Sequence, residues 1–69
     1  MTDKEKRELK ELLDSTPSFR EMIRKGDWNT FWTGCMLAAV QNNKPKYYYA
    51  NRFIEAFNEI GINYKGGSF

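Results

Sequence analysis

The stretch WNTFWTGCMLAAVQ, residues 28–41, decides how this chain folds. It carries no charged side chain, and its apolar residues occupy one helical face and extend beyond it. So wide an apolar arc predicts a helix that is buried on several sides. Asp27 is expected to cap this helix, and Gly34 and Ala38 are small enough to let a neighbouring helix approach closely. We therefore expect Trp28 to Gln41 to form the central helix.

A second apolar helix follows the central one. Asn42 and Asn43 are expected to end the central helix, and Pro45 to open the next one. Its apolar side chains are spaced at three and four and form one continuous face: Tyr49, Phe53, Ala56, Phe57 and Ile60. Gly61 is expected to end this helix as a C-terminal glycine cap, with Ile62 folding back onto Phe57. The expected partners of Tyr49, Phe53 and Phe57 are Trp32, Cys35 and Ala39.

Two further helices precede the central one. The opening Thr2-Asp3-Lys4-Glu5 fits a capping box and predicts a charged helix whose narrow apolar stripe makes it a cover or a docking arm. Pro17 breaks this helix, and a short one with Phe19, Met22 and Ile23 on its apolar face is expected to end at Gly26.

The resulting expectation is an all-α fold, a compact bundle of four short helices with a mobile C-terminal tail. We expect a single helical domain over residues 1–69, with a charged helical arm at 1–16, core helices at 17–62 and a flexible tail at 63–69. The tail is expected to be mobile unless Tyr64 or Phe69 is pinned.

Composition restricts the chemistry. The chain has 69 residues, one cysteine and no histidine, which excludes an internal disulfide and a Cys/His zinc site. We expect no enzyme activity, no metal site and no cofactor, because the chain lacks histidine and its acidic residues are expected to pair with basic neighbours in solvent. Cys35 is expected to be a reduced, buried thiol. No apolar run approaches the roughly 20 residues that cross a bilayer, so we expect no membrane partner and a cytoplasmic protein.

The segment KPKYYYANR, residues 44–52, combines three cations with three adjacent tyrosines and has no acidic residue. Cations neutralise phosphates and exposed tyrosine rings stack on unpaired bases, as a surface for single-stranded nucleic acid requires. The candidate nucleic-acid-binding residues are Lys44, Lys46, Tyr47, Tyr48 and Arg52, with Lys65 as a weaker candidate. The alternative is an ordinary helix start, because three consecutive tyrosines point in three directions and at least one should face the core.

Residues 36–62 resemble the C-terminal half of the DnaD-like replication-initiation domain family. The corresponding segments read Ala38-Ala39-Val40-Gln41-Asn42-Asn43-Lys44, then Tyr49-xxx-Phe53-xxx-Phe57, then Ile60-Gly61-Ile62. Phenylalanine replaces both the aliphatic residue and the tryptophan of the family signature, and the N-terminal third matches poorly. The resemblance implies a role in DNA replication, affinity for single-stranded DNA and contacts with replication proteins, and it maps the signature onto Tyr49, Phe53 and Phe57. The short chain suits an accessory or phage-encoded piece.

The rival hypothesis is a protein-binding module, a small phage-type inhibitor or adaptor that acts on a host replication or defence enzyme. Aromatic residues make up 16% of the chain, more than a core of this size readily hides. We do not expect all of the following five to be buried: Trp28, Phe31, Tyr47, Tyr48 and Phe69. Exposed aromatic side chains are favoured as interface anchors. The same surplus could instead close a homodimer. A nucleic-acid surface, unlike a protein interface, requires Lys44, Lys46 and Arg52 to face the same way as Tyr47 and Tyr48.

Overall fold

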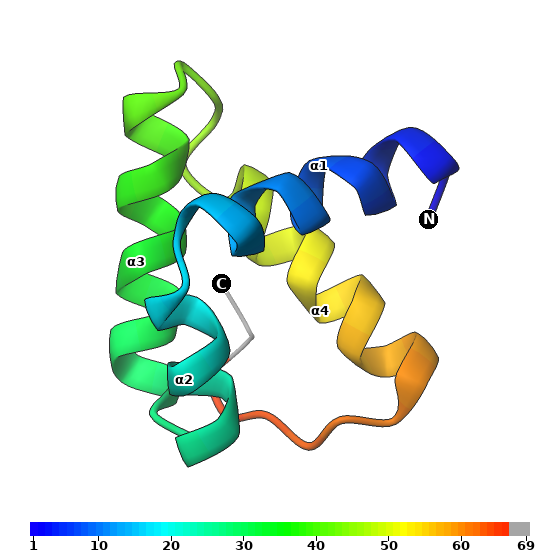
Figure 1. Cartoon of the computed structure of the whole chain (residues 1–69), viewed down its shortest axis with the longest axis vertical. Coiled ribbons are helices and arrows are strands. Elements are labelled where there is room, and N and C mark those ends of the chain that lie inside the picture. Colours follow the sequence, from blue (N-terminus) through cyan, green and yellow to red (C-terminus); the bar gives the residue numbers. More distant parts are fainter. Residues whose placement is uncertain (67–69) are drawn as a thin grey trace.

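A computed structural model describes residues 1–66 of the chain as four α-helices and confirms the all-α expectation (Figure 1). The helices are α1 (Asp3–Ser15), α2 (Ser18–Lys25), α3 (Trp28–Gln41) and α4 (Tyr48–Ile60). The most extensive packing joins α3 to α4, followed by α2 on α3, and α1 then crosses α4 and touches α2. No helix in the described part of the chain is both long enough and apolar enough to cross a membrane.

The core forms between α3 and α4. Both helices supply fully or almost fully buried side chains, among them Phe31, Trp32, Cys35, Ala39, Tyr49, Phe53 and Phe57. Phe31 and Phe53 meet edge to face with their ring centroids 4.9 Å apart, and the ring centroid of Phe57 lies 5.8 Å from that of Phe31 and 6.2 Å from that of Trp32. The stripe of aromatic residues on α4 therefore holds that helix against α3.

The close approach expected at Gly34 is made by α2. A Cβ atom at Gly34 would lie 2.5 Å from Cε1 of Phe19, a residue of α2 that is itself buried. The absence of a side chain at Gly34 therefore creates the space that the Phe19 ring occupies.

The helix ends follow local signals, with two differences from expectation. The capping box at Thr2 and Glu5 is present, and Gly26 and Gly61 have left-handed backbones with φ of 71° and 77°. Asp27 occupies the N-cap of α3, but its side chain makes no capping hydrogen bond. α4 begins at Tyr48 and not at Pro45, because the residues between Asn42 and Tyr47 form a turn.

The segment after α4 packs on the core through Tyr64. The tail was expected to be mobile unless Tyr64 or Phe69 was pinned, and Tyr64 is pinned. The Tyr64 ring contacts Trp28, Trp32 and Phe57, and its hydroxyl donates to Oδ1 of Asn58. The indole N–H of Trp32 donates to the backbone oxygen of Lys65. We also expected residues 67–69 to be flexible unless Phe69 was pinned, and these residues lie outside the described part of the chain.

The aromatic residues that were not all expected to be interior are indeed not all buried, although none of those in residues 1–66 is fully exposed. Phe31 is fully buried, and Trp28, Tyr47 and Tyr48 are half-buried. The large hydrophobic side chains that remain exposed there are aliphatic: Leu37, Val40 and Ile60.

Candidate nucleic-acid interface

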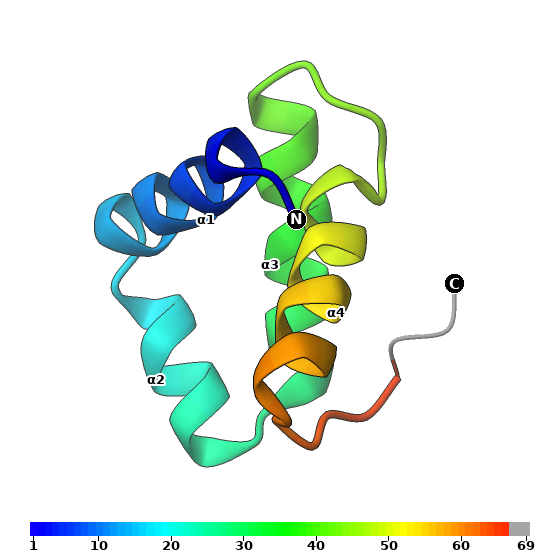
Figure 2. The same cartoon turned by 90° about the vertical axis from the view of Figure 1, so that its right-hand side faces the viewer.

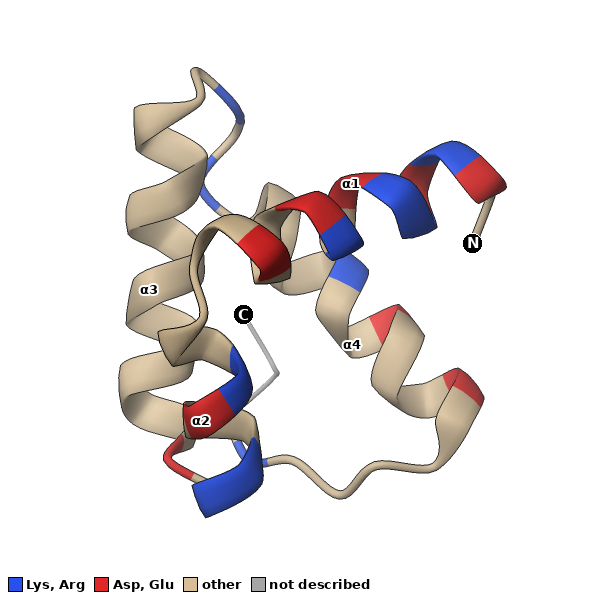
Figure 3. Ribbon diagram, viewed as in Figure 1, with Lys and Arg blue, Asp and Glu red and all other residues tan. Residues whose placement is uncertain are grey.

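The turn between α3 and α4 presents two of the candidate cations to solvent. The backbone N–H groups of Asn43 and Lys44 donate to the carbonyls of Val40 and Ala39, and Asn43 has a left-handed φ of 57°. This double hydrogen bond is a Schellman-type helix end, in which asparagine replaces the usual glycine. The chain therefore leaves α3 abruptly, and Lys44 and Lys46 are both exposed. Figure 3 shows that α3 carries no charge and that basic residues appear in the turn that follows it.

Cations and aromatic rings meet at this turn. Nζ of Lys44 lies 5.0 Å from the ring centroid of Tyr48, and Nζ of Lys46 lies 5.3 Å from that of Tyr47. Both distances fall within the range of cation–π contacts. Each of the two lysines therefore lies over a tyrosine ring, and we call Lys44, Lys46, Tyr47 and Tyr48 together the Lys/Tyr turn.

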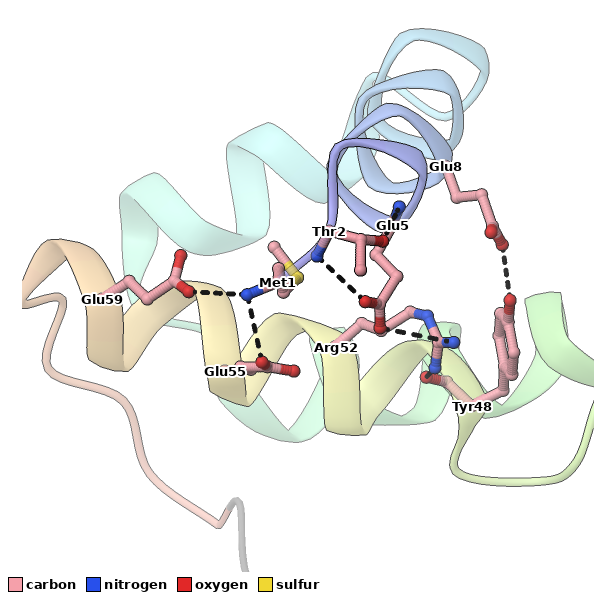
Figure 4. Close-up of polar contacts among 8 residues, drawn as sticks. All are labelled: Met1, Thr2, Glu5, Glu8, Tyr48, Arg52, Glu55 and Glu59. Carbon is pink, nitrogen blue, oxygen red and sulfur yellow. Dashed lines mark hydrogen bonds and ion pairs between the residues drawn. The ribbon is translucent and has the colours of Figure 1, made fainter.

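Arg52 lies next to the Lys/Tyr turn but is held by the protein itself. Its guanidinium stacks on Tyr48, with Cζ 3.7 Å from the ring centroid, and Nη2 lies 3.5 Å from Oε2 of Glu5 (Figure 4). Nη1 donates to the backbone oxygen of Tyr48, whereas Nε is buried and has no hydrogen-bond partner. Arg52 thus serves the contact between α1 and α4, and a phosphate would have to compete with Glu5 for it.

Tyr48 is also tied to α1. Its hydroxyl donates a 2.6 Å hydrogen bond to Oε2 of Glu8, and this bond raises the pKa of the phenol above its usual value (Figure 4). The pKa of the Glu5 carboxyl is lowered, first because it accepts a hydrogen bond from the Thr2 backbone. Two carboxylates therefore lie beside the residues that were expected to meet phosphate, and they reduce the positive potential there.

The remaining candidates are separated from the Lys/Tyr turn. Tyr49, Phe53 and Phe57 are buried, so any effect on binding would pass through the stability of the core. Lys65 follows the C-terminal end of α4, a helix of 13 residues, whereas the turn precedes its N-terminal end. α4 is about 20 Å long at 1.5 Å per residue, and the backbone of Lys65 is held by Trp32 in the first half of α3, whereas the turn follows the last residue of α3.

Glu5 and Glu8 were not among the residues expected at this surface. Their spacing of three on α1 matches the spacing of four between Tyr48 and Arg52 on α4, and each spacing puts two residues on one helical face. Two acidic residues on one helical face and a tyrosine and an arginine on another only weakly predict a contact, because the sequence does not show which two helices meet.

The described residues contain no group of three His, Cys, Asp or Glu side chains placed to hold a metal ion. Cys35 is fully buried, and burial raises the pKa of its thiol to about 12. The thiolate is the nucleophilic form, so burial and the raised pKa both disfavour reaction of this thiol in the folded protein.

No protein-family model, no curated protein and no solved structure matches the chain.

Proposed function

We propose that this chain is a non-catalytic binding module whose Lys/Tyr turn contacts single-stranded nucleic acid. The observation that supports this most directly is the pairing of each exposed lysine with a tyrosine ring in one turn. Lysine and tyrosine side chains together are the types that contact the phosphates and the bases of a single strand. The contact is small, so binding is weak and largely independent of base sequence.

The salt dependence of binding follows from the number of available cations. Each phosphate neutralised on a single strand contributes about −0.7 to the slope of log affinity against log salt, so Lys44 and Lys46 together predict about −1.4. If Arg52 left Glu5 to contact a third phosphate, the slope would be about −2. The measured slope therefore reports whether the contact between α1 and α4 opens when nucleic acid binds.

The experiment is fluorescence anisotropy of a labelled single-stranded oligonucleotide at two salt concentrations. Wild type should bind with an affinity that falls with salt, and the Lys44→Glu/Lys46→Glu variant should lose binding without loss of helical circular dichroism. The matched control is Arg24→Glu/Lys25→Glu, the same charge change at two exposed residues in the last turn of α2. No salt-sensitive binding by wild type at tens of micromolar, or equal loss in both variants, would reject the nucleic-acid contact.

The biological setting that we propose is DNA replication in the cytoplasm, in an accessory role beside other replication proteins. This setting is supported only by the resemblance of residues 36–62 to the DnaD-like domains. Capture of replication proteins by the tagged full chain, repeated after nuclease treatment, would test it. Partners lost on nuclease treatment would be held through nucleic acid, and partners that persist would be bound directly.

A second candidate is a protein-binding inhibitor or adaptor. The half-buried aromatic residues do not favour it, but an open apolar groove between α1, α2 and α4 does. Protein binding through that groove would leave the Lys/Tyr turn free, so the two candidates are tested by different substitutions.

A further inference from the structure

An open groove of about 480 Å³ lies between α1, α2 and α4. It exists because α2 packs on α3 and α1 but does not pack on α4. Figure 2 looks onto the side where α2 and α4 stand apart. The lining includes the buried Phe53 and Phe57 and is otherwise mainly aliphatic: Leu9, Leu13, Ile23, Ala56, Ile60 and Ile62.

α1 and α4, which cross each other, each line the groove with one helical face. α1 contributes Lys6, Leu9, Lys10 and Leu13, and α4 contributes Phe53, Ala56, Phe57 and Ile60, with Glu59 beside them. Each set follows the spacing i, i+3, i+4, i+7, which covers two helical turns, or about 10 Å along the axis. A third helix that places apolar anchors at i, i+3 or i+4, and i+7 spans the same distance. The groove therefore offers apolar helical faces about two turns long, against which one face of a short amphipathic helix can pack.

The shape of the groove favours a helix over a small molecule. Small-molecule sites enclose most of the ligand surface. This groove is open along one side, and Ile60 on its edge remains 69% exposed. A helix needs only one apolar face covered and keeps its other side in water, which matches an open groove.

The rim of the groove is positively charged. Lys6, Lys10 and Arg20 line it together with one carboxylate, Glu59, which already accepts a 2.9 Å hydrogen bond from the Met1 ammonium. Lys10 and Arg20 share the carboxylate of Asp14, but all three side chains are more than half exposed, and exposed ion pairs are weak. Lys6 makes no ion pair within residues 1–66. A carboxylate that approaches the rim therefore meets cations that are free or weakly engaged.

We infer that this groove binds an amphipathic helix of another protein, in which Asp or Glu residues flank the apolar stripe. The apolar stripe would contact the aliphatic walls, and the acidic flanks would face Lys6, Lys10 and Arg20. None of these residues belongs to the Lys/Tyr turn, so this inference does not depend on nucleic-acid binding. It gives the second candidate function a partner of defined chemistry.

The first test is selection of peptides by the immobilised full chain. The probe is a displayed library of amphipathic helices of roughly four turns, about 14 residues, with a fixed apolar stripe and flanking positions randomised among acidic, basic and neutral residues. We expect the selected peptides to be enriched in Asp and Glu at the flanks. No enrichment of any peptide, or flanks without an acidic bias, would overturn the inference.

The second test locates the bound peptide by anisotropy of a selected, labelled sequence. Ile60→Gln should weaken binding about tenfold, as expected for loss of an interface anchor, and Leu37→Gln on α3 is the matched control, because Leu37 is similarly exposed and lies outside the groove. Lys6→Glu should also weaken binding, and a peptide with lysine at its flanks should bind Lys6→Glu better than it binds wild type. Equal loss in Ile60→Gln and Leu37→Gln would place the peptide elsewhere. A wild-type dimer that Ile60→Gln converts to monomer in sedimentation would show that a second copy fills the groove, and would reject the acidic helix as its occupant.

Discussion

The phenol of Tyr48 donates a 2.6 Å hydrogen bond to the carboxylate of Glu8, a residue 40 positions earlier in the chain. This bond joins the first turn of α4 to the middle of α1, and the pair of Glu5 with Arg52 joins the same two helices one turn further along (Figure 4). Tyr48 and Arg52 therefore stabilise the fold, although their side chains are of the types that bind nucleic acid.

Tyr48→Phe should lower the free energy of unfolding by about 1 kcal/mol, because it removes one partly buried hydrogen bond and leaves the Glu8 carboxylate without its donor. Urea unfolding followed by circular dichroism measures this change. Glu8→Gln retains an acceptor and should cost less than Glu8→Ala. In a double-mutant cycle, Tyr48→Phe should have little further effect in a Glu8→Ala background. Full additivity of the two substitutions would show that the bond contributes nothing.

Gly34→Ala should destabilise the protein even though alanine is the better helix former. Helix propensity alone would favour alanine by about 1 kcal/mol, but the new Cβ would lie 2.5 Å from Cε1 of the buried Phe19 ring. Overpacking of this kind costs about 1–3 kcal/mol, so the net effect should be a loss. Thermal unfolding compares this variant with Thr33→Ala, an exposed neighbour on α3 whose substitution makes no such clash. A Gly34→Ala protein more stable than wild type would mean that α2 moves away at little cost.

Phe53→Ala should cost about 3–5 kcal/mol and leave most of the chain unfolded at room temperature, because small domains have little stability to spare. Phe53 is 2% exposed and contacts Phe31 and Phe57 on both sides of the core. Circular dichroism and thermal melting report the change, and Phe53→Leu, which keeps much of the side-chain volume, should lose less. A Phe53→Ala protein that melts like wild type would contradict the role of this residue in the core.

Alkaline pH should destabilise the protein partly through Cys35. The thiol ionises near pH 9.0 in the unfolded chain, whereas burial raises its pKa to about 12 in the folded protein. Between these values the folded state binds more protons, so the free energy of unfolding is unaffected below pH 9.0 and falls as pH rises toward about 12.

Urea unfolding of wild type and Cys35→Ala, below and above pH 9.0, measures this contribution. The variant should lose stability less steeply with rising pH, although it keeps a slope from Tyr48 and Tyr49, whose pKa values are also raised. Labelling of the native thiol by an alkylating reagent should be slow and should require unfolding. Rapid labelling of folded wild type would show that Cys35 is accessible.

The sequence by itself determined the four helices and most of their ends. Apolar residues at a period of 3.6 and the capping signals at Thr2, Gly26 and Gly61 act within a few residues, so they can be interpreted without knowledge of the rest of the chain. The start of α4 was predicted three residues too early, at Pro45. Proline is as compatible with a β-turn as with the first residues of a helix, and here it lies in the loop before α4. The burial of Tyr49, Phe53 and Phe57 also followed from their shared helical face.

Only the tertiary structure decided which of the basic and aromatic residues remain available to a ligand. Arg52 and Tyr48 lie on the face of α4 that α1 covers, whereas Lys44 and Lys46 remain in the exposed turn. The groove between α2 and α4 arises in the same way, from two helices that do not pack on each other. The physical reason is that helical periodicity determines which side chains share a face, whereas the partner of that face depends on how whole helices pack, and residues far apart in the sequence control that packing.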